Sequence, residues 1–126
     1  MRKNFFIFCT ATALMVLVAA CTKQPTSSFK LSKTTAAAGE NITATYDGEN
    51  ANTYVWVAWA GTTNTGASYN INTVSKGQRC DNTWTFNFPD PGTYTVQLRA
   101  VNYKEGCDCT DCSGKSDEST QTITIQ

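Results

Sequence analysis

A period-two alternation of apolar and polar side chains is the feature that most restricts the fold of this chain. Trp84, Phe86 and Phe88 alternate with polar residues, and a second alternating run extends from Tyr94 to Ala100. Successive side chains of a β-strand point to opposite faces, so this pattern predicts strands with one buried face. After residue 21 the sequence shows no convincing 3.6-residue period of an amphipathic helix. The pattern therefore predicts an all-β protein whose core includes these aromatic residues and Trp56.

Turn-forming residues separate the alternating segments. Asp47-Gly48 ends one of them, Pro89-Asp90-Pro91-Gly92 precedes another, and residues 36–39 are expected to form a turn or an irregular connector. Short strands separated by turns over about 100 residues are typical of two antiparallel sheets packed face to face. The expected strands are 29–32, 42–46, 53–59, a short edge strand near 69–74, 83–88, 94–100 and a final strand at 122–125.

The spacing Asp90-x-Gly92-x-Tyr94 matches the corner before strand F of immunoglobulin-like folds. In those folds the tyrosine hydroxyl bonds back to nearby backbone and fixes the turn. Antibody domains carry a cysteine two residues after this tyrosine, whereas this chain has Val96. We therefore expect apolar packing between the sheets in place of the central disulfide.

Three segments resemble PKD domains, an immunoglobulin-like family. Pro91–Asn102 (PGTYTVQLRAVN) resembles the family's late strand, Thr53–Trp56 (TYVW) its strand C, and Thr122–Ile125 (TITI) its last strand. The resemblance covers most of residues 29–126 and places Trp56 at the family's buried tryptophan. After strand C the chain reads Val57–Gly61 (VAWAG) where the family usually has an acidic turn. The resemblance implies a single PKD-like sandwich that serves as an interaction or spacer module.

The first twenty residues have the layout of a bacterial secretory signal. Arg2 and Lys3 are followed by an apolar run from Phe5 to Ala20. The segment Val18–Cys21 (VAAC) resembles a lipobox, which implies cleavage before Cys21 and lipidation of its thiol. We therefore expect a signal peptide at 1–20, a lipidated cysteine and polar tether at 21–28, and the sandwich at 29–126.

This organisation predicts a membrane partner through lipidated Cys21 and a location in the cell envelope, at the outer membrane or its periplasmic face. Thr22–Gln24 has no acidic cluster that would indicate surface export. One alternative is an ordinary cleavable signal with a chance cysteine. Another is a transmembrane helix, but the apolar run of about 16 residues is shorter than the ~20 that a span requires.

Four cysteines remain in the mature domain, and an even number in an exported chain indicates disulfides. A bond between Cys107 and Cys109 would close a strained small ring. Two pairings therefore stay open, Cys80–Cys107 with Cys109–Cys112, or Cys80–Cys109 with Cys107–Cys112. A tetrahedral zinc site formed by the four thiolates and a redox-active Cys109-x-x-Cys112 are the alternatives. We expect disulfides and no metal.

The composition excludes several classes of function. The chain has no histidine, the commonest general base and metal ligand. Arg2 and Lys3 leave with the signal, so eight basic residues face ten acidic ones, without a basic stripe for nucleic acid. We find no nucleophile–base pair, phosphate loop or suitably spaced carboxylate pair. We therefore expect no enzyme activity, no cofactor and no nucleic-acid partner.

Three aromatic residues, Trp59, Tyr69 and Tyr103, fall in or near expected loops. Exposed aromatics at one end of a sandwich stack on sugars or anchor protein partners. Alternatively, these rings cover a small satellite core beneath the loops. The leading hypothesis is a non-catalytic, lipid-anchored module that binds or presents a protein or glycan partner. A structural or accessory envelope lipoprotein and a metal-binding protein remain the alternatives.

Overall fold

A computed structural model describes residues 22–63 and 79–126, which form a sandwich of two β-sheets. One sheet has three strands in the order β1-β3-β5, and the other has four in the order β2-β7-β6-β4. The strands are β1 (Phe29–Leu31), β2 (Thr35–Ala36), β3 (Ile42–Tyr46), β4 (Thr53–Ala60), β5 (Thr83–Phe86), β6 (Gly92–Tyr103) and β7 (Gly114–Ile125). This confirms the predicted all-β sandwich. Across these two ranges, no helix is long and apolar enough to span a bilayer.

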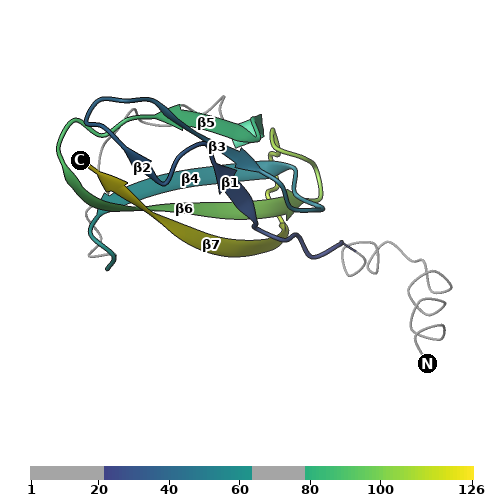
Figure 1. Cartoon of the computed structure of the whole chain (residues 1–126). Coiled ribbons are helices and arrows are strands. Elements are labelled where there is room, and N and C mark those ends of the chain that lie inside the picture. Colours follow the sequence, from purple (N-terminus) through teal and green to yellow (C-terminus); the bar gives the residue numbers. More distant parts are fainter. Residues whose placement is uncertain (1–21, 64–78) are drawn as a thin grey trace, which may run out of the picture.

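The four-stranded sheet is built around β6, which pairs antiparallel with both β4 and β7. The pairing with β7 runs from Gly92 opposite Ile125 to Tyr103 opposite Gly114. The two strands therefore lie side by side along the length of the sandwich (Figure 1). The start of the described chain and the C-terminus lie at opposite ends of the molecule (Figure 1).

Alternate residues of the facing strands form one apolar core between the sheets. Its centre is a series of aromatic rings in contact, with centroid separations of 4.0–6.2 Å. In order of contact these rings are Phe29, Trp56, Trp84, Phe86, Phe88 and Tyr94. All six are buried, which confirms the predicted core positions of Trp56, Trp84, Phe86 and Phe88 and adds Phe29 and Tyr94. Each such side chain contributes roughly 1.5–3 kcal/mol by leaving water.

The corner before β6 has the predicted hydrogen bond. The hydroxyl of Tyr94 donates to the carbonyl oxygen of Asp90 at 2.7 Å. Val96, two residues later, is 0% exposed and packs in the core. Apolar packing therefore occupies the position of the antibody disulfide, as expected.

Two elements differ from the sequence-based expectation. The connector expected at 36–39 includes the end of β2, which pairs in parallel with the last residues of β7. β7 itself begins at Gly114, eight residues before the expected final strand. Its first half carries polar residues on both faces, so it shows no apolar alternation in the sequence.

The polar inner face of β7 binds the N-terminal segment, residues 23–28. Asp117 accepts hydrogen bonds from the hydroxyl and the backbone N–H of Ser27, and Ser119 donates to the carbonyl of Ser27 at 2.5 Å. Gln121 donates to the carbonyl of Phe29. These side chains satisfy backbone groups that a neighbouring strand would otherwise bind. Ser27 is consequently only 4% exposed.

The other side of this segment contacts the β3–β4 turn. The backbone N–H of Thr26 donates to Glu49, and Tyr46 donates its hydroxyl to the carbonyls of Thr26 and Glu49. Gly48 lies so close that a Cβ there would sit 2.7 Å from the carbonyl oxygen of Thr26. The sequence predicts a polar tether at 21–28, but residues 23–28 lie bound along the sandwich.

Candidate functional site

The four cysteines of the described residues lie just before β5 and in the loop between β6 and β7. The β6–β7 loop is at the end of the sandwich where the described chain begins (Figure 1). Cys80 pairs with Cys107 with a Cα–Cα distance of 5.3 Å, and Cys109 pairs with Cys112 at 5.2 Å. The structure thus selects one of the two pairings that the sequence left open. Cys80 precedes β5 of the three-stranded sheet and Cys107 follows β6 of the four-stranded sheet. This bridge therefore links the two sheets at their margin.

The surroundings of the cystines do not favour a thiolate metal site. Cys80, Cys107 and Asp108 offer atoms within 4.8 Å of one another. Both sulfurs are in a disulfide, however, and a disulfide has no thiolate to donate to zinc. Arg79 donates to the carbonyl of Cys107 at 2.6 Å and lies 3.9 Å from the sulfur of Cys109. These contacts hold the cystine loop against the residues before β5.

The three candidate binding aromatics do not form one exposed group. Trp59 lies inside β4 and is 4% exposed, so its ring is not available as a stacking platform. Its indole Nε1 is buried without a hydrogen-bond partner in the described residues. Tyr103 is half-buried at the end of β6, and Tyr69 lies outside the described residues. The satellite-core interpretation therefore fits Trp59 better than the binding one.

Two tyrosines beside the N-terminal segment have perturbed acidity. Desolvation raises the pKa of Tyr54, whose hydroxyl donates to the carbonyl of Ala51 at 3.1 Å. Desolvation also raises the pKa of Tyr46, against the opposing effect of its hydrogen bond to Thr26. Their ring centroids are 5.0 Å apart. Both hydroxyls hold loops through hydrogen bonds to backbone carbonyls.

The side of the four-stranded sheet that faces away from the core is a broad surface that carries polar groups of β4, β6 and β7. We call it the outer face. Register across β4, β6 and β7 aligns Val55, Arg99 and Glu118 in one row and Val57, Gln97 and Thr120 in the next. In the following row Thr95, which is only 4% exposed, lies between the buried Trp59 and Thr122, and in the last row Thr93 pairs with Thr124. Val55 is 40% exposed, and the guanidinium of Arg99 lies 4.0 Å from the carboxylate of Glu118. The face thus combines amide, guanidinium and hydroxyl groups with two valines.

Threonine is a good strand former, so its abundance on the outward faces of these strands predicts no function by itself. In the sequence, the polar residues of each alternating segment indicate the outward face of that strand. They do not indicate which strands lie next to one another on that face. Only the pairing of β6 with both β4 and β7 brings Gln97 and Arg99 beside Thr120 and Glu118. The outer face is therefore a product of register.

Comparison with known proteins supports the fold. No family model matches the chain, and no curated protein matches it. A solved structure of carbohydrate-binding modules from the β-sandwich superfamily, studied for their promiscuous specificity, is similar with a TM-score of 0.51 and 20% identity. The match covers 83% of this chain but only 35% of that one. At this identity the likeness shows that the chain shares the β-sandwich fold.

Proposed function

We propose that this chain is a lipid-anchored, non-catalytic module of the bacterial cell envelope that binds a glycan on its outer face. The observation that carries the proposal is the composition of that face. Amide, guanidinium and hydroxyl groups from three strands stand in register beside Val55 and Val57. Sugars present vicinal hydroxyls that such donors and acceptors bind, and apolar ring faces that cover a small apolar patch.

Further support comes from the fold and from the sequence. The solved structure with a similar sandwich belongs to carbohydrate-binding modules. The segment Pro91–Asn102 resembles PKD-like interaction modules, and the Val18–Cys21 pattern resembles a lipobox. Lipidation of Cys21 would retain the module at the envelope, since two or more acyl chains hold a protein stably on a bilayer.

Glycan binding is tested by calorimetric titration of the isolated protein with a panel of envelope polysaccharides. We expect binding that the double substitution Gln97→Ala and Arg99→Ala weakens at least tenfold, which corresponds to about 1.4 kcal/mol. Thr85→Ala on the exterior of the three-stranded sheet is the matched control and should bind like the unmodified protein. Absence of binding across the panel, or equal loss in the control, would refute a glycan site on the outer face.

The anchor is tested separately by the intact mass of the protein isolated from membranes. We expect a chain that begins at Cys21 and carries acyl groups. A mass that includes residues 1–20, or a processed chain without lipid, would refute anchoring and leave the glycan question unaffected.

A further inference from the structure

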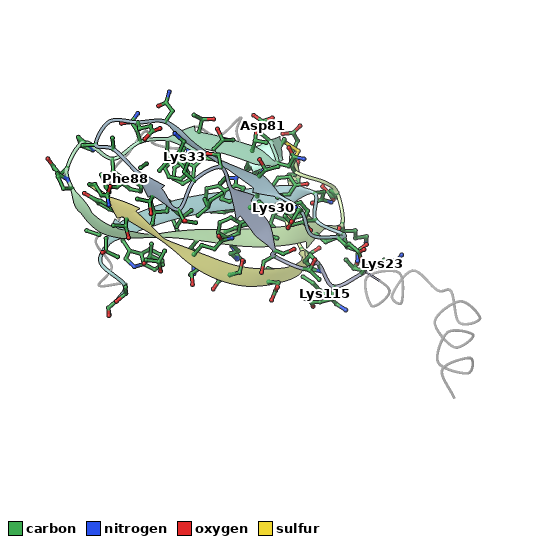
Figure 2. All side chains as sticks on the ribbon, viewed as in Figure 1. Lys23, Lys30, Lys33, Asp81, Phe88 and Lys115 are labelled. Atoms are coloured by element: carbon green, nitrogen blue, oxygen red, sulfur yellow. A yellow bond between two sulfur atoms is a disulfide. The ribbon has the colours of Figure 1, made fainter. Side chains whose placement is uncertain are left out.

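A groove lies beside the point where the described chain begins. It has a volume of about 200 Å³ and is lined by Thr22, Lys104, Ser113, Gly114 and Lys115. Two of its lining residues are joined by a 2.9 Å hydrogen bond from the N–H of Lys104 to the carbonyl of Ser113. We call it the anchor-side groove. Figure 2 shows Lys115 and Lys23 at the same end of the molecule, where the chain begins.

The chain is fixed next to this groove. Asn102 donates to the carbonyl of Lys23 at 3.0 Å, and Gln24 donates to the carbonyl of Ser116 at 2.8 Å. Only Thr22 separates the bound residue Lys23 from Cys21. Thr22, which lines the groove, is joined directly to Cys21 by a peptide bond.

The lysines at this end lack carboxylate partners. Elsewhere in the described residues, Lys30 pairs with Asp47, Lys33 with Glu40, and Arg99 with Glu118. Arg79 donates to the carbonyl of Cys107. Within the described part of the chain, no carboxylate lies within 4.0 Å of the ammonium groups of Lys23, Lys104 and Lys115.

Carboxylates also lie at this end, those of Asp108 and Asp111 in the β6–β7 loop and those of Glu105 and Asp117. Glu105 accepts the backbone N–H groups of Thr110 and Asp111, and Asp117 accepts both hydrogen bonds from Ser27. Three ammonium groups without a carboxylate of the described residues within 4.0 Å therefore lie on the groove or next to it in the chain, those of Lys23, Lys104 and Lys115.

We propose that the anchor-side groove and Lys23 form a membrane-contact surface, in which the three lysines bind the phosphates of anionic lipid headgroups. This inference rests on the proposed anchoring through Cys21. Acyl chains on that residue place the groove at headgroup level, because the bound segment 23–28 leaves no free tether to lift the domain. The strands would then run away from the bilayer and hold the outer face to the side.

The test is amine-acetylation footprinting of the isolated full-length protein, read by mass spectrometry lysine by lysine. The protein is reconstituted into vesicles of phosphatidylcholine alone and of phosphatidylcholine with phosphatidylglycerol. We expect Lys23, Lys104 and Lys115 to be acetylated about fivefold more slowly in the anionic vesicles, the effect of one lysine–headgroup interaction. Lys30 and Lys33 are internal controls and should react alike in both.

Equal rates at the three lysines in both vesicles would overturn the proposal. Equal protection of the three lysines in neutral vesicles would also overturn it, because it would show that proximity to the bilayer is sufficient. Protection by inorganic phosphate alone at matched ionic strength would overturn it as well, because it would show a site for free anions. The variant Lys104→Gln with Lys115→Gln should lose the protection of Lys23, whereas Lys30→Gln with Lys33→Gln should keep it. An intact mass without acyl groups would refute the lipid anchor separately. The acetylation rates can be measured on both the lipidated and the unlipidated protein.

Discussion

The carboxylate of Asp117 accepts two hydrogen bonds from Ser27, one from its hydroxyl at 2.7 Å and one from its backbone N–H at 3.1 Å. These residues are 90 positions apart, near the end of the bound segment 23–28 and on the inner face of β7. Because of this pair, residues 23–28 pack as part of the sandwich and do not form a free tether. This relationship supports both the placement of the groove and the orientation proposed for the domain.

Asp117→Ala should release the segment 23–28 from β7. We expect a loss of about 1–2 kcal/mol in the free energy of unfolding, because two hydrogen bonds to the carboxylate are lost. Hydrogen exchange at Ser27 should accelerate in parallel. Glu118→Ala on the outer face breaks only an exposed ion pair and should cost less than about 1 kcal/mol. Unchanged exchange at Ser27 in Asp117→Ala would contradict this account.

Tyr94→Phe should destabilise the corner before β6 without changing its packing. The substitution removes the 2.7 Å hydrogen bond to Asp90 but keeps the ring stacked on Phe88. We expect a loss of about 1–2 kcal/mol from urea denaturation, because the carbonyl of Asp90 loses its partner. The m-value should stay constant, and a stability equal to that of the unmodified protein would show that the corner contributes nothing.

The two disulfides should contribute unequally to stability. Cys80–Cys107 has a sequence separation of 27 and Cys109–Cys112 a separation of 3. In the chain-entropy model their removal costs about 3.5 and about 2 kcal/mol respectively. Paired Cys→Ser variants compared by thermal and denaturant unfolding measure the difference. Equal losses would mean that loop closure does not determine their contribution.

Stability should fall at alkaline pH, partly through Tyr54. Burial raises the pKa of Tyr54 above its ordinary value of 10.0, so the unfolded chain loses this proton at a lower pH than the folded chain does. The unfolded state then binds fewer protons, and the free energy of unfolding decreases as the pH rises above about 10. Below that pH the contribution is fully present. Tyr54→Phe should therefore show a shallower alkaline decline, and an unchanged slope would contradict the assignment.

The sequence alone determined the fold class and the positions of most described strands. These depend on local properties, because the alternation that defines β3, β4, β5 and β6 is read from neighbouring residues. The Asp90–Tyr94 corner is equally local, since donor and acceptor are four residues apart. The aromatic core followed from the same alternation, because residues two positions apart share the buried face.

Tertiary structure decided everything that depends on residues distant in the chain. The polar first half of β7 is a strand because it pairs with β6 and binds the segment around Ser27, and neither partner is visible in its own sequence. The choice of Cys107 as the partner of Cys80 depends on how two sheets meet at one end. Trp59 is buried although it is out of phase with Trp56 and Ala58, the core residues of β4. Lys104 and Lys115 line one groove from opposite ends of the β6–β7 loop. Composition and period describe each strand alone, whereas a site depends on which strands the fold brings together.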